Sequence, residues 1–303
     1  MKTLKTKTLA WHHLHRPAPA DLKWLERHFN LHGLVLDELT RPTARPRVDN
    51  FGDYLYLVLH FPIFDQQERK THPREIDFVL TKHELITVTY EVIGPLEDFF
   101  KKCSTDQSCE ELFASKTPAH LIFHVIKNLY AFALRELDHI QESIDRIEDE
   151  IFANREREMV EELSIVRRDL IDFRRAIKPQ LMTLESLAEQ SQTLFGPSLK
   201  PFFAGLIGEF TKVWDLLENN KEALDALYDN NATLLEVKQN DTMKILTIMA
   251  FTTFPLMLFT ALFSMDTIAT PIIGLRYDFW IILSIMIAAT VGMFVFFKRK
   301  KWL

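Results

Sequence analysis

Two long stretches without a charged residue constrain this chain more than any other feature. Residues 245–265 read ILTIMAFTTFPLMLFTALFSM, and residues 279–297 read FWIILSIMIAATVGMFVFF. An α-helix rises about 1.5 Å per residue, so about 20 residues cross the roughly 30 Å hydrocarbon core of a bilayer. A helix that is apolar all round is either a buried core helix or a membrane span, and core helices seldom run this long without a charge. We therefore predict two transmembrane helices, neither of them placed like a signal peptide.

The basic residues beyond the second stretch predict its orientation. The sequence KRKK follows it at once, at 298–301, and such clusters stay on the cytoplasmic side of a membrane. Because the cluster abuts a span, a nuclear-localisation signal is the weaker interpretation. Residues 1–240 show no export signal. We therefore expect both termini in the cytoplasm, a basic cytoplasmic tail over 298–303 and one outward loop over 266–278.

Charge and composition narrow the possible functions. Residues 1–240 hold 30 Lys and Arg against 39 Asp and Glu, so the body of the chain is acidic and unsuited to binding nucleic acid. Cys103 and Cys109 have no second pair with which to build a zinc site, so we expect free thiols in a reducing compartment. The sequence has no Gly-rich phosphate loop, nucleophile elbow or HExxH helix. We therefore expect neither an enzyme nor a resident cofactor.

The first part of the chain, residues 1–116, is expected to be an α+β cytoplasmic domain. Runs rich in β-branched and aromatic residues predict three strands, over 54–60, 77–80 and 85–90. Short helices are expected over 21–30 and 33–39. The Pro-rich segment 41–47, RPTARPR, interrupts the pattern between them and the first strand.

A histidine tract lies near the start of the same domain. Residues 11–15 read WHHLH, and a strand would place His13 and His15 on one face, where imidazoles could bind zinc. A surface strand with incidental histidines is the simpler interpretation.

Long helices are expected from residue 117 onward, beginning with a helical hairpin over 117–196. Pro118 suits the first turn of a helix, and apolar residues recur at helical spacing from there to Ile151. A second helix is expected over about 155–190. The join between them carries seven acidic residues: Glu148, Asp149, Glu150, Glu156, Glu158, Glu161 and Glu162. Such a tip is either a solvated face or a cation sensor.

A third helix has no clear breaker between residues 198 and 263. It would form a stalk over 197–244 and continue directly into the first span, with a kink at Pro255 inside the bilayer. At the standard rise it would be on the order of 100 Å long. Most helical stability in proteins comes from tertiary packing, so a stalk of this length needs neighbours. We therefore expect an oligomer.

The C-terminal hairpin combines several recognisable features. Residues 240–247 read NDTMKILT, Pro255 follows within the first span, and KKWL ends the chain at 300–303. Together with the short loop and second span, they resemble the CorA family of divalent-cation channels. The zinc-transporting ZntB proteins are similar in architecture. The resemblance is strong over about 225–303 and architectural over the first 200 residues.

The resemblance implies a fold, an assembly and an activity. It implies a funnel-shaped homopentamer in a bacterial inner (plasma) membrane, with stalk helices and first spans around a central pore. A divalent cation would pass through that pore as the transported substrate. Magnesium, cobalt, nickel and zinc all suit an oxygen-lined path. The partners would be other copies of the chain and the lipid bilayer.

The family signature at the outer mouth of the pore is Gly-Met-Asn, and this chain departs from it. The corresponding residues are Ser264, Met265 and Asp266, which the resemblance implies form the selectivity filter. Five Asp266 carboxylates in a ring would attract cations strongly, and their mutual repulsion would raise some of their proton affinities. The departure also leaves open a chain that no longer conducts.

A 3-4 repeat predicts which residues face the axis if Met243 does so, as its family counterpart does. The predicted pore-lining residues are Asp229, Thr233, Glu236, Asn240, Met243, Thr247, Ala250, Phe254, Met257 and Ala261. Phe254 and Met243 are the candidate gates, because five phenyl rings on the axis would close a pore by dewetting. The alternative places Phe254 in a helix–helix seam. Asp229 matches an acidic family position at the cytoplasmic exit, so Asp229 and Asp266 are the candidate transient metal sites.

Three functions remain open at this point. The first is a divalent-cation channel, and the second is a non-conducting CorA-like membrane sensor or regulator whose acidic domain binds ions or a partner. The third is a proton-coupled zinc transporter in which Asp266 titrates. A channel needs Asp266 ionised, a coupled transporter needs it to cycle, and a sensor should tolerate its loss.

Overall fold

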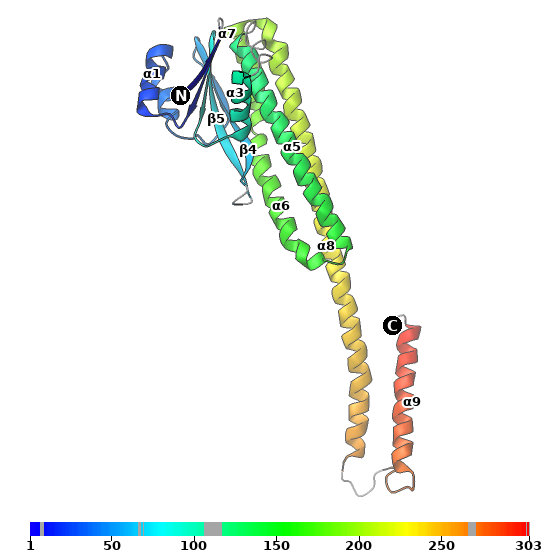
Figure 1. Cartoon of the computed structure of the whole chain (residues 1–303). Helices are drawn as coiled ribbons and strands as arrows, with labels where there is room; N and C mark the ends of the chain where they lie inside the picture. The colour runs from blue at the N-terminus through cyan, green and yellow to red at the C-terminus, as the bar shows by residue number, and fades with distance from the viewer. Residues whose placement is uncertain are drawn as a thin grey trace. The chain divides into compact units, whose positions relative to one another are not determined.

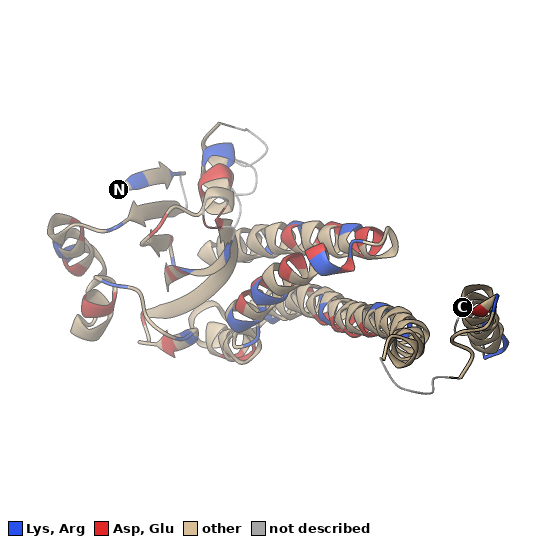
Figure 2. Ribbon diagram, turned by 90° about the horizontal axis from the view of Figure 1, so that it is seen from below, with Lys and Arg blue, Asp and Glu red and all other residues tan. Residues whose placement is uncertain are grey.

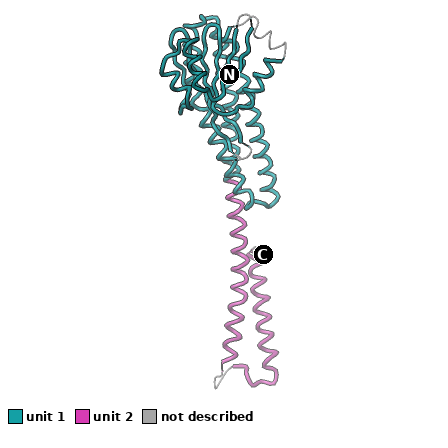
Figure 3. Tube along the Cα trace, turned by 60° about the vertical axis from the view of Figure 1, so that its left-hand side comes forward, with its two compact units in different colours: residues 1–228 teal, residues 229–303 magenta. Residues whose placement is uncertain are grey.

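The chain divides into two compact units, residues 1–228 and residues 229–303 (Figure 3). The structure, a computed structural model, describes these residues: 1–6, 9–65, 68, 70–105, 117–265, 271–300 and 302. Unit 1 is an α/β domain with long helices, and unit 2 holds two long apolar helices.

A six-stranded sheet organises the N-terminal part of unit 1. Its strands are β1 (Lys2–Lys5), β2 (Ala10–His15), β3 (Arg47–Asn50), β4 (Tyr54–Asp65), β5 (Lys70–Thr81) and β6 (Glu84–Thr89). Their order across the sheet is β1-β2-β6-β5-β4-β3, with β2 and β6 parallel and the other neighbours antiparallel. The long β4–β5 pair forms because β4 is almost entirely β-branched, aromatic and leucine residues.

One face of the sheet is covered by α1 (Pro19–Phe29) and α2 (Gly33–Glu38). Successive side chains of a strand point to opposite faces, so alternate residues build this core. The buried strand residues of the cluster are Leu14, Tyr54, Tyr56, Val58, Val79, Ile86 and Val88. Leu25 of α1 and Val35 of α2 pack into it.

The other face is covered by α3 (Gly94–Thr105) and by the long helices (Figure 1). Trp11 of β2 meets Phe100 of α3 edge-on, with ring centroids 4.7 Å apart. Phe61 of β4 meets Tyr130 of α5 (Pro118–Phe152) in the same way at 5.4 Å. Both faces of the sheet are therefore buried.

Most of the predicted elements of the first domain are confirmed. The three predicted strands are parts of β4, β5 and β6, and the two short helices are α1 and α2. The prediction that the histidine tract is a surface strand is wrong. β2 lies between β1 and β6, and His12 and His13 are buried. A histidine-rich strand resembles a surface strand in sequence, because its burial depends on partners that lie far along the chain.

Two long helices follow, and then a shorter one. α5 is paired with α6 (Glu156–Ile177), and Asn154, with φ at 68°, lies in the turn between them. The prediction of one helix over 155–190 is wrong, because the segment is divided into α6 and α7 (Gln180–Phe195). Pro179 lies at this division, where it supplies no N–H for a helical hydrogen bond.

The stalk and the first span form one helix, as predicted. After a short 3-10 turn, η1 (Pro197–Leu199), α8 (Lys200–Phe263) runs for 64 residues. At the standard rise it is about 96 Å long. Pro255 lies inside it.

Unit 2 contains the membrane-spanning candidates. The C-terminal part of α8 and all of α9 (Asp278–Arg299) are long and apolar enough to cross a bilayer. Their apolar side chains are mostly exposed in the single chain, including Phe251, Leu258, Val291 and Phe294. Such a surface needs lipid or further copies of the chain to cover it.

Candidate functional site

The predicted pore-lining residues form one face of α8 that the chain itself leaves largely uncovered. Met243, Phe254 and Met257 are 56%, 68% and 61% exposed. Thr247 and Ala250 are half-buried, and the other five predicted positions are exposed. A charged or polar face of this kind is ordinary on a soluble helix, but an uncovered Met and Phe face is not.

The opposite face of α8 is buried within unit 1. The buried residues are Phe203, Leu206, Phe210, Val213, Leu217, Asn220, Leu224 and Leu227. They alternate in steps of three and four residues, as the predicted pore-lining residues do. Asp229 lies two residues from Leu227, about 200° around the helix. At this point of α8, Asp229 therefore lies on the side of the helix opposite the buried stripe.

Polar contacts hold this buried face in register. Asn220 donates its Nδ2 hydrogen to the carbonyl of Leu137 at 2.8 Å, inside an otherwise apolar interface. The guanidinium group of Arg174 lies over the Trp214 ring at 5.5 Å and 3.4 Å from the Glu218 carboxylate. A buried amide that must find its partner disfavours a slip of the helix along its axis.

In unit 2, α9 lies along a third side of α8 but leaves its apolar side chains largely exposed. Phe251 and Pro255 of α8 and Gly292 and Met293 of α9 are among the residues that line a cavity of about 710 Å³ between the two helices. Phe251 lies one residue beyond Ala250, about 100° around the helix from the predicted pore face. The segment after α9 lies closer to the predicted face, because Trp302 lines a second cavity, of about 370 Å³, with Asn240, Met243 and Thr247.

The part of the predicted face from Asp229 to Thr247 carries oxygen atoms. The Thr233 hydroxyl donates to the carbonyl of Asp229 at 2.9 Å, and the Thr247 hydroxyl donates to that of Met243 at 2.7 Å. Each hydroxyl keeps its lone pairs for a cation or its water, because its hydrogen is already used. With the oxygens of Asp229, Glu236 and Asn240, this surface suits hard divalent cations.

The predicted selectivity filter is described only in part. The amide of Ser264 donates to the carbonyl of Thr260 at 3.0 Å. α8 ends at Phe263, directly before the predicted filter. Met265 is exposed, and Asp266 lies outside the described residues. After the loop, the Asp278 carboxylate accepts the amide hydrogen of Phe279 at 2.7 Å and places a negative charge at the start of α9.

His12 and His13 of β2 belong to the core, whereas His15 is exposed. His13 lies 2.9 Å from the Thr87 hydroxyl and 3.0 Å from the Glu97 carboxylate. Burial lowers the pKa of His13 below its usual 6.5, although Glu97 opposes that effect. Burial raises the pKa of Glu97, but hydrogen bonds from Lys2 and His13 outweigh it and hold that pKa below its usual value.

A buried carboxylate cluster lies on the face of the sheet under α2. Asp77 is fully buried and accepts a hydrogen bond from the Tyr90 hydroxyl at 2.6 Å. Burial, and then the neighbouring charge of Glu75, raise the pKa of Asp77 well above its usual 3.8. Burial and Asp77 also raise the pKa of Tyr56. The carboxyl group of Asp77 therefore keeps its proton to a higher pH than an exposed aspartate would.

In the part of the chain that the structure describes, neither the acidic hairpin tip nor Cys103 belongs to a cluster that could hold a metal ion. Arg155 pairs with Glu150 at 2.9 Å, and Arg146 lies 3.9 Å from Glu162. Charged residues of both signs are spread along the helices, as Figure 2 shows. Among the residues that the structure describes, no three His, Cys, Asp or Glu side chains gather to hold a metal ion. Cys103 is half-buried, and Cys109 lies outside the described residues.

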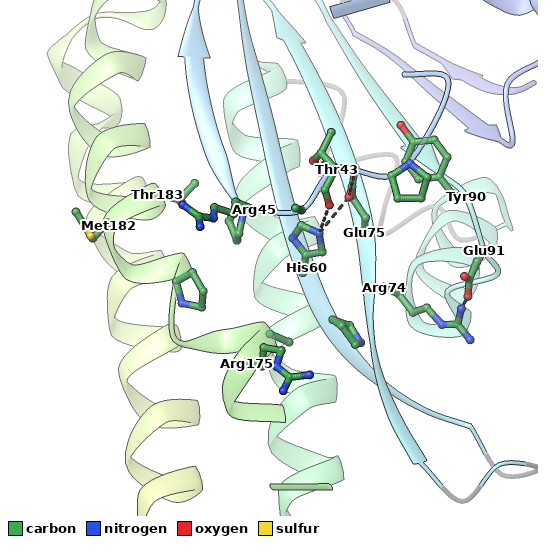
Figure 4. Close-up of a pocket in the computed structure, with 16 residues that line it drawn as sticks. Thr43, Arg45, His60, Arg74, Glu75, Tyr90, Glu91, Arg175, Met182 and Thr183 are labelled. Carbon is green, nitrogen blue, oxygen red and sulfur yellow. Dashed lines mark hydrogen bonds and ion pairs between the residues drawn. The ribbon is translucent and has the colours of Figure 1, made fainter. Parts of the chain in front are cut away.

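A cavity beside the Pro-rich segment 41–47 could not be predicted from the sequence. This cavity, of about 830 Å³, is lined by residues of segment 41–47, of β4 and β5, and of the junction between α6 and α7 (Figure 4). The one available signal was the composition of RPTARPR, in which Pro alternates with Arg. Its other walls come from residues 60–91 and from residues 175–183, the latter more than a hundred positions later.

Comparisons with known proteins cover the whole chain. A family model described as CorA-like Mg2+ transporter protein matches residues 6–299. The cobalt/magnesium transport protein CorA of Thermotoga maritima is 26% identical over 275 residues, which cover 91% of this chain and 78% of that protein. The zinc transport protein ZntB of Yersinia pestis is 20% identical over 303 residues, 97% of this chain and 88% of that one. The complete structure of the CorA magnesium transporter from Methanocaldococcus jannaschii superposes with a TM-score of 0.86 at 19% identity, covering 100% of this chain and 95% of that chain.

Proposed function

Because the chain belongs to the CorA-like Mg2+ transporter family, we propose that it carries divalent cations across a membrane through a pore at the centre of a homopentamer. The relatives named above transport cobalt, magnesium and zinc. Magnesium, cobalt, nickel and zinc are the candidate substrates of this chain, since all four bind oxygen ligands.

One observation carries this proposal. The predicted pore-lining residues begin at Asp229, on the side of α8 opposite the stripe from Phe203 to Leu227 that packs within unit 1. α8 is continuous from this packed part into the span. Copies of the chain arranged around an axis would cover the exposed face and keep the buried face on their own helices. The packing of α8 within unit 1 would thereby decide which of its residues face the pore inside the membrane.

The proposed path changes in chemistry along α8. At its cytoplasmic end, rings of Asp229 and Glu236 would attract cations, and Asn240 and Thr247 would replace part of their water. Met243 and Phe254 are the proposed constrictions. Five apolar side chains around an axis exclude water when they close, so a hydrated divalent ion cannot pass.

Asp266 is the proposed cation attractor at the outer mouth. A carboxylate ring there would concentrate cations from the outside before they enter the pore. An inward-negative potential favours entry by about 2.3 kcal/mol per charge per 100 mV, and by twice that for a divalent ion. The proposed transport therefore needs no nucleotide hydrolysis.

We place the protein in a bacterial inner membrane with both termini in the cytoplasm. Lys298, Arg299 and Lys300 close α9 and support this orientation by the positive-inside rule. α9 would face lipid, since its exposed side chains include Ile287, Val291 and Phe294.

Ion flux into proteoliposomes that hold the purified full chain tests the proposal. Magnesium, cobalt, nickel and zinc would be offered separately to wild type, Asp266→Asn and Asp266→Ala. Asp241→Asn is a matched control, because Asp241 pairs with Lys244 at 2.8 Å and lies off the predicted face.

We expect flux of at least one ion in wild type and in the control. We expect it to fall by on the order of a hundredfold in Asp266→Ala, about 2.7 kcal/mol of lost attraction. No flux of any ion through pentameric protein would contradict the proposal. Flux that depends on a proton gradient would point to a coupled transporter.

A further inference from the structure

A groove runs between the two apolar helices of unit 2, which lie side by side (Figure 3). It is the cavity of about 710 Å³ beside Phe251 and Pro255 of α8. Its other wall is one side of α9, because the lining residues recur there at helical spacing. They are Ala289, Gly292, Met293, Phe296, Phe297 and Lys300.

The groove is as long as one leaflet of a bilayer is deep. Lys300 lies eleven positions after Ala289, which corresponds to about 16 Å along α9 at the standard rise. The hydrocarbon core of a bilayer is about 30 Å thick, so one leaflet accounts for about half of that. The acyl chain of one phospholipid therefore matches the length of the groove.

The two ends of the groove differ in chemistry. Toward Ala289 its walls are apolar, whereas Lys300 lines its other end. Lys298 and Arg299 directly precede Lys300, and all three side chains are exposed. Lys and Arg next to the cytoplasmic surface of a membrane attract anionic lipids. An anionic head group with an apolar chain therefore complements the groove along its whole length.

Trp302 lines the groove beside Lys300. Its ring stacks on that of Phe297, with the ring centroids 6.0 Å apart, and its amide donates to the Phe297 carbonyl at 3.1 Å. Tryptophan is enriched where a membrane meets water, because its ring is apolar and its indole N–H is polar. Trp302 therefore marks the end of the groove at which a lipid head group would lie.

Gly292 keeps the middle of the groove wide. Glycine in a membrane helix commonly allows a neighbouring helix to approach closely. Here a Cβ atom on Gly292 would meet no other atom of the described chain within 4 Å, so α8 does not use that space. Phe251 and Phe296, on the two walls, are 63% and 58% exposed. These apolar walls gain contacts from whatever occupies the groove.

The basic end of the groove favours a lipid over a second copy of the chain as the occupant. Copies arranged around an axis across the membrane carry the same residues at the same depth. A neighbouring copy would therefore bring its own Lys298, Arg299 and Lys300 toward Lys300 of the groove, and like charges repel. An anionic head group brings the opposite charge.

We propose that this groove binds an anionic phospholipid of the cytoplasmic leaflet, with its phosphate at Lys300 and one acyl chain between Pro255 and Gly292. The proposal rests on the placement of unit 2 in a membrane and not on the passage of cations. The bound lipid would fasten the end of α9 to α8, where the two helices leave their apolar side chains largely exposed.

The test is quenching of tryptophan fluorescence by phospholipids that carry bromine near the head-group end of an acyl chain. The full chain with Trp280→Phe would be reconstituted into phosphatidylcholine vesicles, which leaves Trp302 as the tryptophan of unit 2. Brominated phosphatidylglycerol and brominated phosphatidylcholine would be added at equal mole fractions. The same protein with Trp302→Phe supplies the background signal of unit 1.

Two matched pairs of variants separate the groove from the surface around it. Lys300→Gln removes the charge at the groove, and Lys298→Gln removes an equal charge about 200° around α9. Gly292→Phe fills the groove, and Val291→Phe adds bulk at an exposed position outside the lining. Gel filtration and thermal unfolding check that each variant is assembled and folded.

We expect phosphatidylglycerol to compete for the site beside Trp302 about fivefold better than phosphatidylcholine, the effect of one basic residue near an anionic surface. Lys300→Gln should remove most of this preference, and Lys298→Gln should leave it within about twofold. Gly292→Phe should weaken quenching by both lipids, whereas Val291→Phe should weaken neither.

Three results would overturn the assignment. Equal quenching by the two lipids would exclude a preference for an anionic head group. Equal losses in Lys300→Gln and Lys298→Gln would show a general effect of surface charge. Quenching of Trp302 by neither lipid would show that another copy of the chain fills the groove. All three are read without cation flux, so a failure of the proposed transport is a separate result.

Discussion

The two halves of α8 have the same helical geometry and opposite surroundings. From Phe203 to Leu227 one face is buried against helices of the same chain, and the other face is exposed. From Met243 to Ala261 nearly every face is exposed, and most of the side chains are apolar. The soluble half is therefore stabilised within one chain, whereas the membrane half needs lipid and other chains.

This difference shows how a single helix can connect packing with transport. In the soluble half, the buried stripe fixes which way each residue points. In the membrane half nothing within the chain fixes it, because an apolar helix in lipid has no preferred face of its own. We propose that the orientation of Phe254 and Ala261 follows from the buried stripe earlier in the same helix, since α8 is one helix from Lys200 to Phe263.

The largest expected contrast comes from one phenylalanine in each half. Phe210 is buried beside Tyr130 and Trp214, so Phe210→Ala should lower the free energy of unfolding of unit 1 by about 3–5 kcal/mol. Phe254→Ala should leave that stability within about 0.5 kcal/mol and raise cation flux, because it removes a constriction. Tryptophan fluorescence during thermal unfolding and flux into proteoliposomes would measure the two effects. Equal losses of stability would show that Phe254 is packed in a seam.

The buried carboxyl group of Asp77 gives a second contrast, and its expected effect on stability is of intermediate size. The raised pKa of Asp77 means that the folded chain keeps a proton at pH values where the unfolded chain has lost it. Stability should therefore fall as the pH rises above 3.8, by up to about 1.4 kcal/mol per pH unit, until the pH passes the folded pKa.

Asp77→Asn removes this dependence while its amide oxygen can still accept the Tyr90 hydrogen. The difference in unfolding temperature between Asp77→Asn and wild type should therefore grow in favour of the variant as the pH rises from about 4 to about 7. Parallel pH profiles for the two proteins would refute a protonated Asp77. Asp241→Asn, an exposed carboxylate of the other half, should show no such trend.

The smallest effect is expected from a surface pair of the soluble half. Arg167 lies 3.8 Å from the Asp225 carboxylate, and both side chains are well exposed. Arg167→Gln should cost less than about 1 kcal/mol of stability, and added salt should reduce that loss further. A larger loss would mean that the contact of Arg167 with the Tyr228 ring matters more than the ion pair.

The long helices could be predicted from the sequence because their pattern is local. The periodic apolar residues of α5 and the absence of breakers in α8 were enough. The division at Pro179 was missed because an apolar pattern continues on both sides of it. β2 was misplaced because burial of a histidine-rich strand depends on Thr87 and Glu97, which lie more than 70 residues away.

The candidate sites differ in the same way. The face of α8 that carries Phe254 followed from a repeat along one helix, together with a resemblance that supplied Met243 as its starting point. The cavity beside segment 41–47 could not be predicted, because its walls come from segments that are distant in the sequence and meet only in the folded chain.

The most direct test of the inherited register compares two adjacent residues near the outer end of α8. In a background with Cys103 and Cys109 replaced by Ser, Ala261→Cys and Leu262→Cys would each be treated from outside with a charged, water-soluble thiol reagent during cation flux. Both positions are exposed in the single chain, so accessibility in the assembled membrane protein depends on which face lines the pore. We predict rapid modification and block of flux for Ala261→Cys and neither for Leu262→Cys. Block at Leu262→Cys, with Ala261→Cys unreactive, would contradict the register.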